Sequence, residues 1–178
     1  MLGQKIRKKR MEKNLSLKEL AEKTDLTASF LSQVERDLAE PSITSLRKIA
    51  EALEVPIFYF LLDNGNTSPV VRKNERKVLK FPESHLIYEL LTPNLNGQME
   101  VMMARLEEGG ISCDEPSTHP GEECIYVLQG KMEIAVGDEV YVLEEGDSIY
   151  YFAAIPHKIV NVGEGELVFI SAITPPRF

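Results

Sequence analysis

The stretch SLKELAEKTDLTASFLSQVER, residues 16–36, has the pattern of two short helices joined by a tight turn. Ser16 and Glu19 have the spacing of a capping box, which predicts that a helix begins there. Apolar residues then recur at helical spacing until Asp25 interrupts them. Thr27 can cap a second helix that runs to the end of the stretch.

The second of these helices is expected to have an apolar face and a polar face. Leu31 and Val34 fall on the apolar side, and hydrogen-bonding side chains fall on the other. Helix-turn-helix proteins present such a polar face to the major groove of DNA. An ordinary helical hairpin with a solvated face has the same spacing, so spacing alone leaves both interpretations open. The polar face consists of Ser29, Ser32, Gln33 and Arg36.

The residue types favour DNA binding. The pattern LxxLAxxxxLxxSxLSxxERxxxxPSxxxLxxIAxAL, residues 17–53, closely resembles the repressor and Cro-like, XRE-type DNA-binding domains. Asp25 stands where that family has Gly at the turn, and Asp tolerates the left-handed conformation. The resemblance implies a double-stranded DNA operator as partner. The DNA-binding residues that we expect are Ser16, Thr27, Ser29, Ser32, Gln33 and Arg36.

Three further helices are expected around this pair, which makes an all-α, five-helix domain over residues 1–62. Residues 2–13 read as a basic first helix, whose charged face could be solvated or contact phosphates. Ser42 can cap a fourth helix, and Pro56 fits the start of a short fifth one. The family resemblance also implies an ion pair between Arg10 and Glu35.

Charge is distributed unevenly along the 178 residues, which carry a net charge of −8. Residues 1–80 hold 16 Lys and Arg against 11 Asp and Glu, whereas residues 81–178 hold 4 against 17. A basic DNA-reading domain attached to an acidic domain would have this distribution. Two cysteines outside any CxxC, and no long apolar run, predict a cytoplasmic protein with no membrane association.

The segment DNGNTSP, residues 63–69, marks the boundary between the two domains. We expect a linker over residues 63–80, although its basic part could pair as an edge strand or run along DNA. From residue 81 to 178, short apolar or alternating runs separated by turn residues indicate an all-β barrel or jelly roll. The expected strands are 87–91, 99–106, 123–128, 131–136, 139–143, 148–152, 158–162 and 166–173.

Two segments of this β domain resemble the motifs of the cupin superfamily, whose fold is a small double-stranded β-helix barrel. Counting back from Gly130 places Glu123 on the carboxylate of the first motif and His119 on its second histidine. Ser117 falls where the first histidine of the motif would stand. His157 matches the histidine of the second motif, whose usual Pro and Gly are absent here.

His119, Glu123 and His157 could therefore bind a divalent metal such as Zn, Fe or Ni, with two imidazoles and one carboxylate. The alternative is a metal-free pocket in which these groups hydrogen-bond to a ligand or to each other. The effector pocket that we expect is lined by Ser117, His119, Glu123, Tyr151, Phe152 and His157, with Tyr126 nearby.

Together the two resemblances imply a bacterial transcriptional regulator that joins an XRE-type domain to a cupin sensor. We expect a homodimer on a palindromic operator, with a small-molecule effector in the barrel, and no enzymatic activity. One alternative is a cupin metalloenzyme, an isomerase or dioxygenase, tethered to a DNA-binding domain. Another is a regulator whose cupin domain only dimerises.

Overall fold

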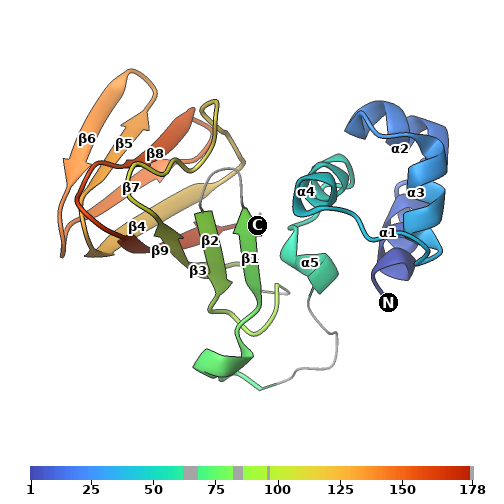
Figure 1. Cartoon of the computed structure of the whole chain (residues 1–178), viewed down its shortest axis with the longest axis horizontal. Helices are drawn as coiled ribbons and strands as arrows, with labels where there is room; N and C mark the ends of the chain where they lie inside the picture. Colours follow the sequence, from blue (N-terminus) through green and yellow to red (C-terminus); the bar gives the residue numbers. More distant parts are fainter. Residues whose placement is uncertain (62–67, 82–85, 96, 177–178) are drawn as a thin grey trace. The chain divides into compact units, whose positions relative to one another are not determined.

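The computed structural model describes residues 1–61, 68–81, 86–95 and 97–176, and it divides them into a helical unit and a β-sheet unit (Figure 1). No helix within these ranges is long and apolar enough to cross a membrane. The described helices of the first unit are α1 (Leu2–Glu12), α2 (Leu17–Thr24), α3 (Ala28–Glu35), α4 (Ile43–Ala52) and α5 (Phe58–Leu61).

Local capping defines the ends of α2 and α3 as predicted. The Ser16 hydroxyl accepts a hydrogen bond from the Glu19 amide at 3.2 Å, and the Glu19 carboxylate accepts one from the Ser16 amide at 2.7 Å. Asp25 ends α2 in the left-handed conformation, with φ of 53°. The Thr27 hydroxyl then accepts a hydrogen bond from the Phe30 amide at 3.1 Å and caps the start of α3.

The core of the helical unit packs α3 against α1 and α2. Leu20 of α2, Leu31 of α3 and Ile49 of α4 are completely buried. Gly3 lies so close to α3 that a β-carbon there would collide with the Val34 carbonyl oxygen. Burial of three such side chains contributes about 1.5–3 kcal/mol each, and this is what holds α3 in place.

The second unit contains two antiparallel sheets. The six-stranded sheet has the order β1-β2-β3-β9-β4-β7, and the three-stranded sheet has the order β6-β5-β8 (Figure 1). The strands are β1 (Val78–Phe81), β2 (Leu86–Leu90), β3 (Glu100–Leu106), β4 (Glu122–Gln129), β5 (Met132–Val136), β6 (Glu139–Leu143), β7 (Ser148–Phe152), β8 (His157–Asn161) and β9 (Leu167–Thr174). A 3₁₀ turn, Lys73–Glu75, precedes β1.

The fold class expected from the sequence is confirmed. Each of the eight expected strands is present, with ends that differ by no more than one residue from the prediction. The last three residues of the predicted linker, residues 63–80, belong to β1, which pairs with β2, so the edge-strand alternative applies to them. Residues 63–67 of that linker lie outside the described residues.

An ion pair ties α1 to α3. Arg10 donates from Nε to Glu35 Oε1 at 2.6 Å and from Nη2 to Oε2 at 2.9 Å, and its Nη1 donates to the Leu15 carbonyl at 2.7 Å. The two side chains are only 12% and 5% exposed. Both side chains of this bidentate pair are largely buried. Removing either one would leave the charge of the other buried without a partner, which would lower the stability of the fold. The pair implied by the family resemblance is present.

We expect Arg10→Ala and Glu35→Ala each to lower the free energy of unfolding of the helical unit by about 3–5 kcal/mol. The double variant should lose less than the sum of the two losses, with a coupling energy of about 1–3 kcal/mol. Urea unfolding followed by circular dichroism at 222 nm measures both quantities. The exposed pair Arg47–Glu51 is the control and should couple by about 0.5 kcal/mol or less. A coupling of zero for Arg10 and Glu35 would contradict this account.

Candidate functional site

The first candidate surface is the polar face of α3. Ser29, Gln33 and Arg36 are exposed and Ser32 is half-buried, whereas Leu31, Val34 and Glu35 are buried against the core. The side chains expected to contact DNA therefore share one accessible face of a helix whose other face is fixed by packing. The structure brings together all four of the predicted α3 residues.

Ser16 and Thr27 use their hydroxyl oxygens as caps for α2 and α3. Capping occupies an oxygen lone pair and leaves the hydroxyl proton available to donate to a phosphate. Arg36 donates from Nε to the Ser32 carbonyl at 3.0 Å, which orients its guanidinium and leaves its terminal N–H groups free to donate. Both caps and Arg36 are exposed.

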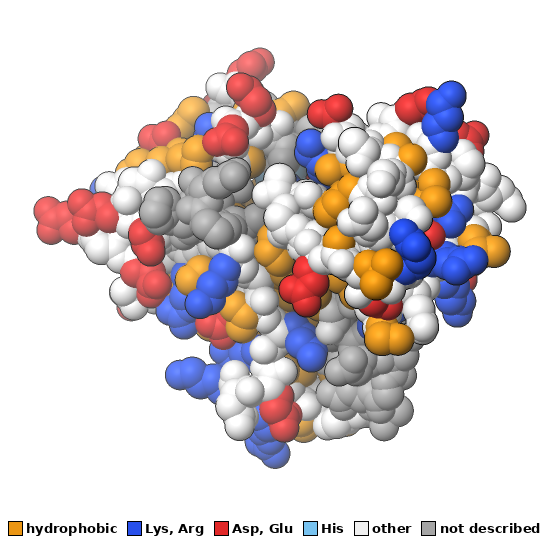
Figure 2. Space-filling model, turned by 45° about the vertical axis from the view of Figure 1, so that its right-hand side comes forward, with side chains coloured by type: hydrophobic (Ala, Val, Ile, Leu, Met, Phe, Trp, Pro, Cys, Tyr) orange, Lys and Arg blue, Asp and Glu red, His pale blue; other side chains and the backbone are white. Residues whose placement is uncertain are grey.

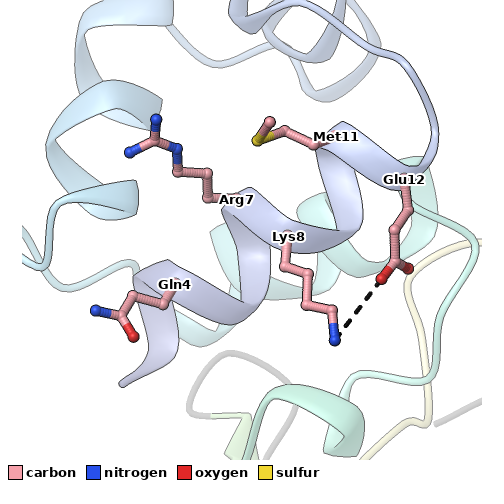
Figure 3. Close-up of a pocket in the computed structure, with 5 residues that line it drawn as sticks. All are labelled: Gln4, Arg7, Lys8, Met11 and Glu12. Atoms are coloured by element: carbon pink, nitrogen blue, oxygen red, sulfur yellow. Dashed lines mark ion pairs between the residues drawn. The ribbon is translucent and has the colours of Figure 1, made fainter.

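A shallow open hollow runs along the outer side of α1 (Figure 3). Its lining side chains all come from this single helix: Gln4, Arg7, Lys8, Met11 and Glu12. Lys8 is 3.9 Å from Glu12, so its charge is partly balanced within the helix. This surface carries basic groups, but its side chains do not converge around an enclosed cavity. It therefore does not have the form of a small-molecule site.

The second candidate site lies in the β-sheet unit around Glu123. In the strand register, Glu123 of β4 lies opposite Tyr151 of β7 on one side and Ile173 of β9 on the other. All three are buried, so this row of side chains faces the interior. The Tyr151 hydroxyl donates to Glu123 Oε2 at 2.7 Å, and the Ser171 hydroxyl donates to Oε1 at 2.6 Å.

Two histidines complete the cluster. His119 Nε2 is 3.4 Å from Glu123 Oε2, and His157 Nε2 is 3.8 Å from the same oxygen. Each histidine is 6% exposed, and the two rings meet edge to face at 5.2 Å. The Nδ1 atoms lie 3.3 Å and 2.9 Å from the backbone carbonyls of Pro120 and Ile155. Where these carbonyls accept N–H from Nδ1, each Nε2 keeps a lone pair that can bind a metal ion.

This donor set fits a metal ion. One ligand atom from each of His119, Glu123 and His157 lies within 4.8 Å of the others. Two imidazole nitrogens and one carboxylate oxygen suit Zn(II), Fe(II) or Ni(II). Backbone carbonyls near both Nδ1 atoms can accept N–H there, which is the tautomer in which Nε2 binds a metal. These three side chains could therefore hold one divalent ion.

The carboxyl group of Glu123 is ionised in spite of its burial. Burial alone would raise the pKa of Glu123, but hydrogen bonds from His119, Ser171 and Tyr151 outweigh it and lower this pKa below its ordinary value of 4.5. Burial and the charge of Glu123 raise the pKa of Tyr151, so the phenol remains a donor at neutral pH. The pocket wall thus carries a fixed negative charge.

The remaining predicted pocket residues divide between the two faces of the sheet. Ser117 lies beside His157, because their backbones exchange two hydrogen bonds of 2.9 Å. Tyr151 faces inward as expected. Phe152 and Tyr126 do not line the pocket, because strand alternation turns them outward, where they are 58% and 44% exposed. Cys124 is also exposed.

Three groups near the site were not predicted. Ser171 of β9 hydrogen-bonds Glu123, and both Tyr88 of β2 and Cys113 interact electrostatically with Tyr151. Cys113 Sγ also lies 4.0 Å from Ser117 Oγ. None of these residues belongs to a motif, and only the pairing of distant strands brings Ser171 to the carboxylate. An inward-facing polar residue in an apolar strand was the one available signal for it.

Comparison with known families agrees with this architecture. Residues 6–60 match the helix-turn-helix family model, and residues 102–173 match the cupin domain model. The chain therefore consists of an XRE-type helix-turn-helix domain followed by a cupin domain.

Three known proteins align with almost the whole chain. The HTH-type transcriptional regulator PuuR of Escherichia coli K12 is 26% identical over 99% of this chain and 96% of its own length. The crystal structure of an HTH_3 family transcriptional regulator from Vibrio cholerae is 26% identical, with a TM-score of 0.70 over 99% of this chain and 96% of that one. Hydroxypropylphosphonic acid epoxidase from S. wedmorenis shares the fold at 21% identity, with a TM-score of 0.50 over 97% of this chain and 96% of its own.

We expect Tyr151→Phe to lower the free energy of unfolding of the metal-free protein by about 1.5–3 kcal/mol at neutral pH, because a hydrogen bond to a buried charge is lost. The folded-state pKa of Glu123 lies below its unfolded value, so its stabilising contribution is present above pH 4.5 and lost as the pH falls through the folded pKa. The variant raises that folded pKa. The stability gap between wild type and variant should therefore close in acid.

Denaturant unfolding at a series of pH values, with chelator present, measures this gap. Ser171→Ala should show the same pH dependence, because it removes the other hydroxyl donor. Tyr141→Phe, at a site 45% exposed, should change nothing. A gap for Tyr151→Phe that is constant from neutral pH to acid would show that the hydrogen bond does not act through the charge of Glu123.

Proposed function

We propose that this protein is a sequence-specific DNA-binding transcriptional regulator whose cupin domain binds a small-molecule effector and so modulates operator binding. The observation that carries the proposal is the exposed polar face of α3, held on a rigid buried core behind a tight turn. The alignment with the E. coli and Vibrio cholerae regulators over both domains supports it. We place the protein in the cytoplasm, where its operator would be.

The α3 face divides into side chains suited to bases and side chains suited to phosphates. Gln33 is exposed, and its amide can make a bidentate contact with adenine. Ser29 stands in the first turn of α3, where recognition helices reach base edges. Arg36, Ser16 and Thr27 lie at helix ends and suit phosphates, and Ser32 lies between the two groups.

Charge supports a DNA-reading role for the helical domain alone. Acidic side chains stand out at the left of the space-filling view (Figure 2). Residues 81–178 carry 17 acidic and 4 basic residues, so this domain would repel a DNA backbone. The helical domain has the small basic excess and the hydrogen-bonding face.

We expect Gln33→Ala to relax base preference at one operator position, with a loss of about 1–3 kcal/mol for the operator and little loss for random DNA. Arg36→Ala should weaken both duplexes alike and reduce the slope of log K against log salt by about one. Fluorescence anisotropy with operator and random duplexes of equal length at several salt concentrations measures both effects. Equal losses on the two duplexes for Gln33→Ala would refute its role in base recognition.

We further propose that the regulator acts as a homodimer on a palindromic operator. A single helix-turn-helix domain contacts one half-site, and a dimer reaches two half-sites about 34 Å apart. An effector can change operator affinity only if it binds differently to the DNA-competent and incompetent arrangements of the dimer. A tenfold change in affinity requires about 1.4 kcal/mol of that difference.

The cluster at Glu123 is the proposed sensing site. His119, His157 and Glu123 would hold a divalent metal, which would offer an effector an open coordination position as Lewis acid. Tyr151 and Ser171 keep Glu123 ionised and fix its orientation. Ser117, beside His157, has a smaller side chain than the histidine of the family motif, which suits a ligand approaching from that side.

The same donor set makes a cupin metalloenzyme the second candidate function. Two imidazoles and a carboxylate with open positions also occur at non-haem iron oxygenase centres. The two candidates differ in their readout: a sensor changes operator affinity without consuming its ligand, whereas an enzyme turns the ligand over. The DNA-binding face on the same chain favours the sensor.

We expect the purified protein to bind one divalent ion per chain, because two imidazole nitrogens and one carboxylate oxygen lie within reach of a single ion. His119→Ala with His157→Ala should abolish this binding, as metal analysis and native mass spectrometry would measure. His85→Ala, which changes the third histidine of the sequence, is the matched control and should retain the metal. The double variant should keep its operator affinity and lose its response to effector. A full response in the double variant would place the sensing site elsewhere.

A further inference from the structure

We propose that residues 72–80, which we call the basic segment, bind the phosphate backbone of the DNA that the helical domain contacts. The inference rests on the proposed function in one respect, namely that DNA is the partner of the helical domain. The basic segment, RKNERKVLK, carries five basic residues and one acidic residue. It includes the 3₁₀ turn Lys73–Glu75 and the first three residues of β1.

The charge of the basic segment contrasts with that of the chain after it. Residues 81–178 carry 4 basic and 17 acidic residues, so five of the nine basic residues after position 62 stand within the basic segment. An acidic surface repels a DNA backbone and a basic one attracts it. Positive charge is therefore concentrated in the part of the β-sheet unit that follows the helical domain in the chain.

Three cations of the basic segment are exposed and unpaired. The side chains of Arg72, Lys73 and Lys80 are exposed. Within the residues that the structure describes, none of these three side chains forms an ion pair, although the domain is rich in carboxylates. Their positive charge is therefore available to an anion outside the chain.

The backbone of the basic segment is held by the sheet. Arg76 Nη1 donates to Glu89 Oε2 at 3.0 Å, and the Lys77 carbonyl accepts the Leu90 amide at 2.9 Å. Leu79 is 1% exposed and packs inward. The exposed cations thus extend from an ordered backbone, so fewer degrees of freedom are lost when they bind a ligand.

Lysine on an edge strand has another common role. β1 is an edge of the six-stranded sheet (Figure 1), and charged side chains on an edge prevent pairing with another chain. That role is sufficient to explain Lys80, which lies on β1 opposite Ile87. It does not explain Arg72 and Lys73, which come before the strand. Arg72 and Lys73 are therefore the residues that test DNA binding.

The covalent chain keeps the basic segment within reach of DNA bound by the helical domain. Arg72 follows Leu61, the last residue of α5, by 11 positions. A chain extends by at most about 3.6 Å per residue, so these two residues are no more than about 40 Å apart. One helical turn of duplex is about 34 Å long. Phosphates near the half-site are therefore accessible to the basic segment.

Binding of phosphates by the basic segment would add affinity without base preference. Each contact of Lys or Arg with a phosphate releases counterions, which makes the affinity fall as salt rises. Residues 1–62 hold 11 basic and 9 acidic residues, so the helical domain supplies little excess charge of its own. An acidic partner protein would also be attracted to these cations, but it would not make the affinity for DNA depend on them.

The test is the double variant Arg72→Gln with Lys73→Gln, in which both changes are at exposed positions. Fluorescence anisotropy measures binding of the full chain to a random-sequence duplex and to a duplex enriched from a random library. The slope of log K against log salt should become shallower by about 1.8 on both duplexes, because two phosphate contacts are lost. The affinity advantage of the wild type should accordingly shrink about tenfold between 50 and 200 mM salt.

Two control variants separate local contact from net charge. Lys131→Gln with Lys158→Gln removes two positive charges from the same domain, outside the basic segment, and should leave the slope unchanged. Arg72→Lys with Lys73→Arg keeps both charges and should bind like the wild type. Circular dichroism of each variant establishes that it is folded.

An unchanged slope for Arg72→Gln with Lys73→Gln would overturn the inference, and so would an equal change for Lys131→Gln with Lys158→Gln. If the wild type prefers the enriched duplex while the slope of the variant is unchanged, the proposed function stands and the inference fails. If the slope changes as expected but no sequence is preferred, the inference stands and sequence-specific regulation fails. A wild type that binds neither duplex would overturn both.

Discussion

A buried negative charge is the constraint on which the β-sheet domain depends. Glu123 is ionised inside the sheet sandwich, where an unpaired carboxylate would cost several kcal/mol. Hydroxyl groups from Tyr151 and Ser171 satisfy one oxygen each, and two imidazole nitrogens approach the oxygen that Tyr151 contacts. These groups come from four different strands or loops, so the charge can be accommodated only when the whole domain is assembled.

The helical domain has the corresponding constraint at α3. Its inner face is fixed by buried apolar residues, by the close approach of Gly3, and by the ion pair between Arg10 and Glu35. Because Glu35 lies next to Arg36 and two residues from Gln33, whatever fixes Glu35 also fixes the direction of the side chains that we propose contact DNA. Base recognition depends on placement within a fraction of an ångström, so a rigid helix favours specificity. Packing on the buried side of α3 thus determines the direction in which the polar side chains of its exposed side point.

Much of this arrangement could be predicted from the sequence, because caps and strand alternation are local signals. Ser16, Asp25 and Thr27 determine helix ends within a few residues of themselves, and the expected strands agree closely with those observed. Contacts between distant strands could not be predicted in the same way. Ser171 reaches Glu123 from 48 residues away through the pairing of β9 with β4. Phe152 was placed in the pocket with Tyr151, although neighbours in a strand point to opposite faces, so only one of them could line it.

The central claim is that the polar face of α3 reads a DNA sequence in the context of a two-fold dimer. Selection of bound duplexes from a random DNA library by the purified full-length protein, followed by sequencing, tests it most directly. The account predicts an enriched palindrome whose half-sites are about 34 Å apart, with at least one adenine position that depends on Gln33. Recovery of random sequences without any enriched motif would contradict it.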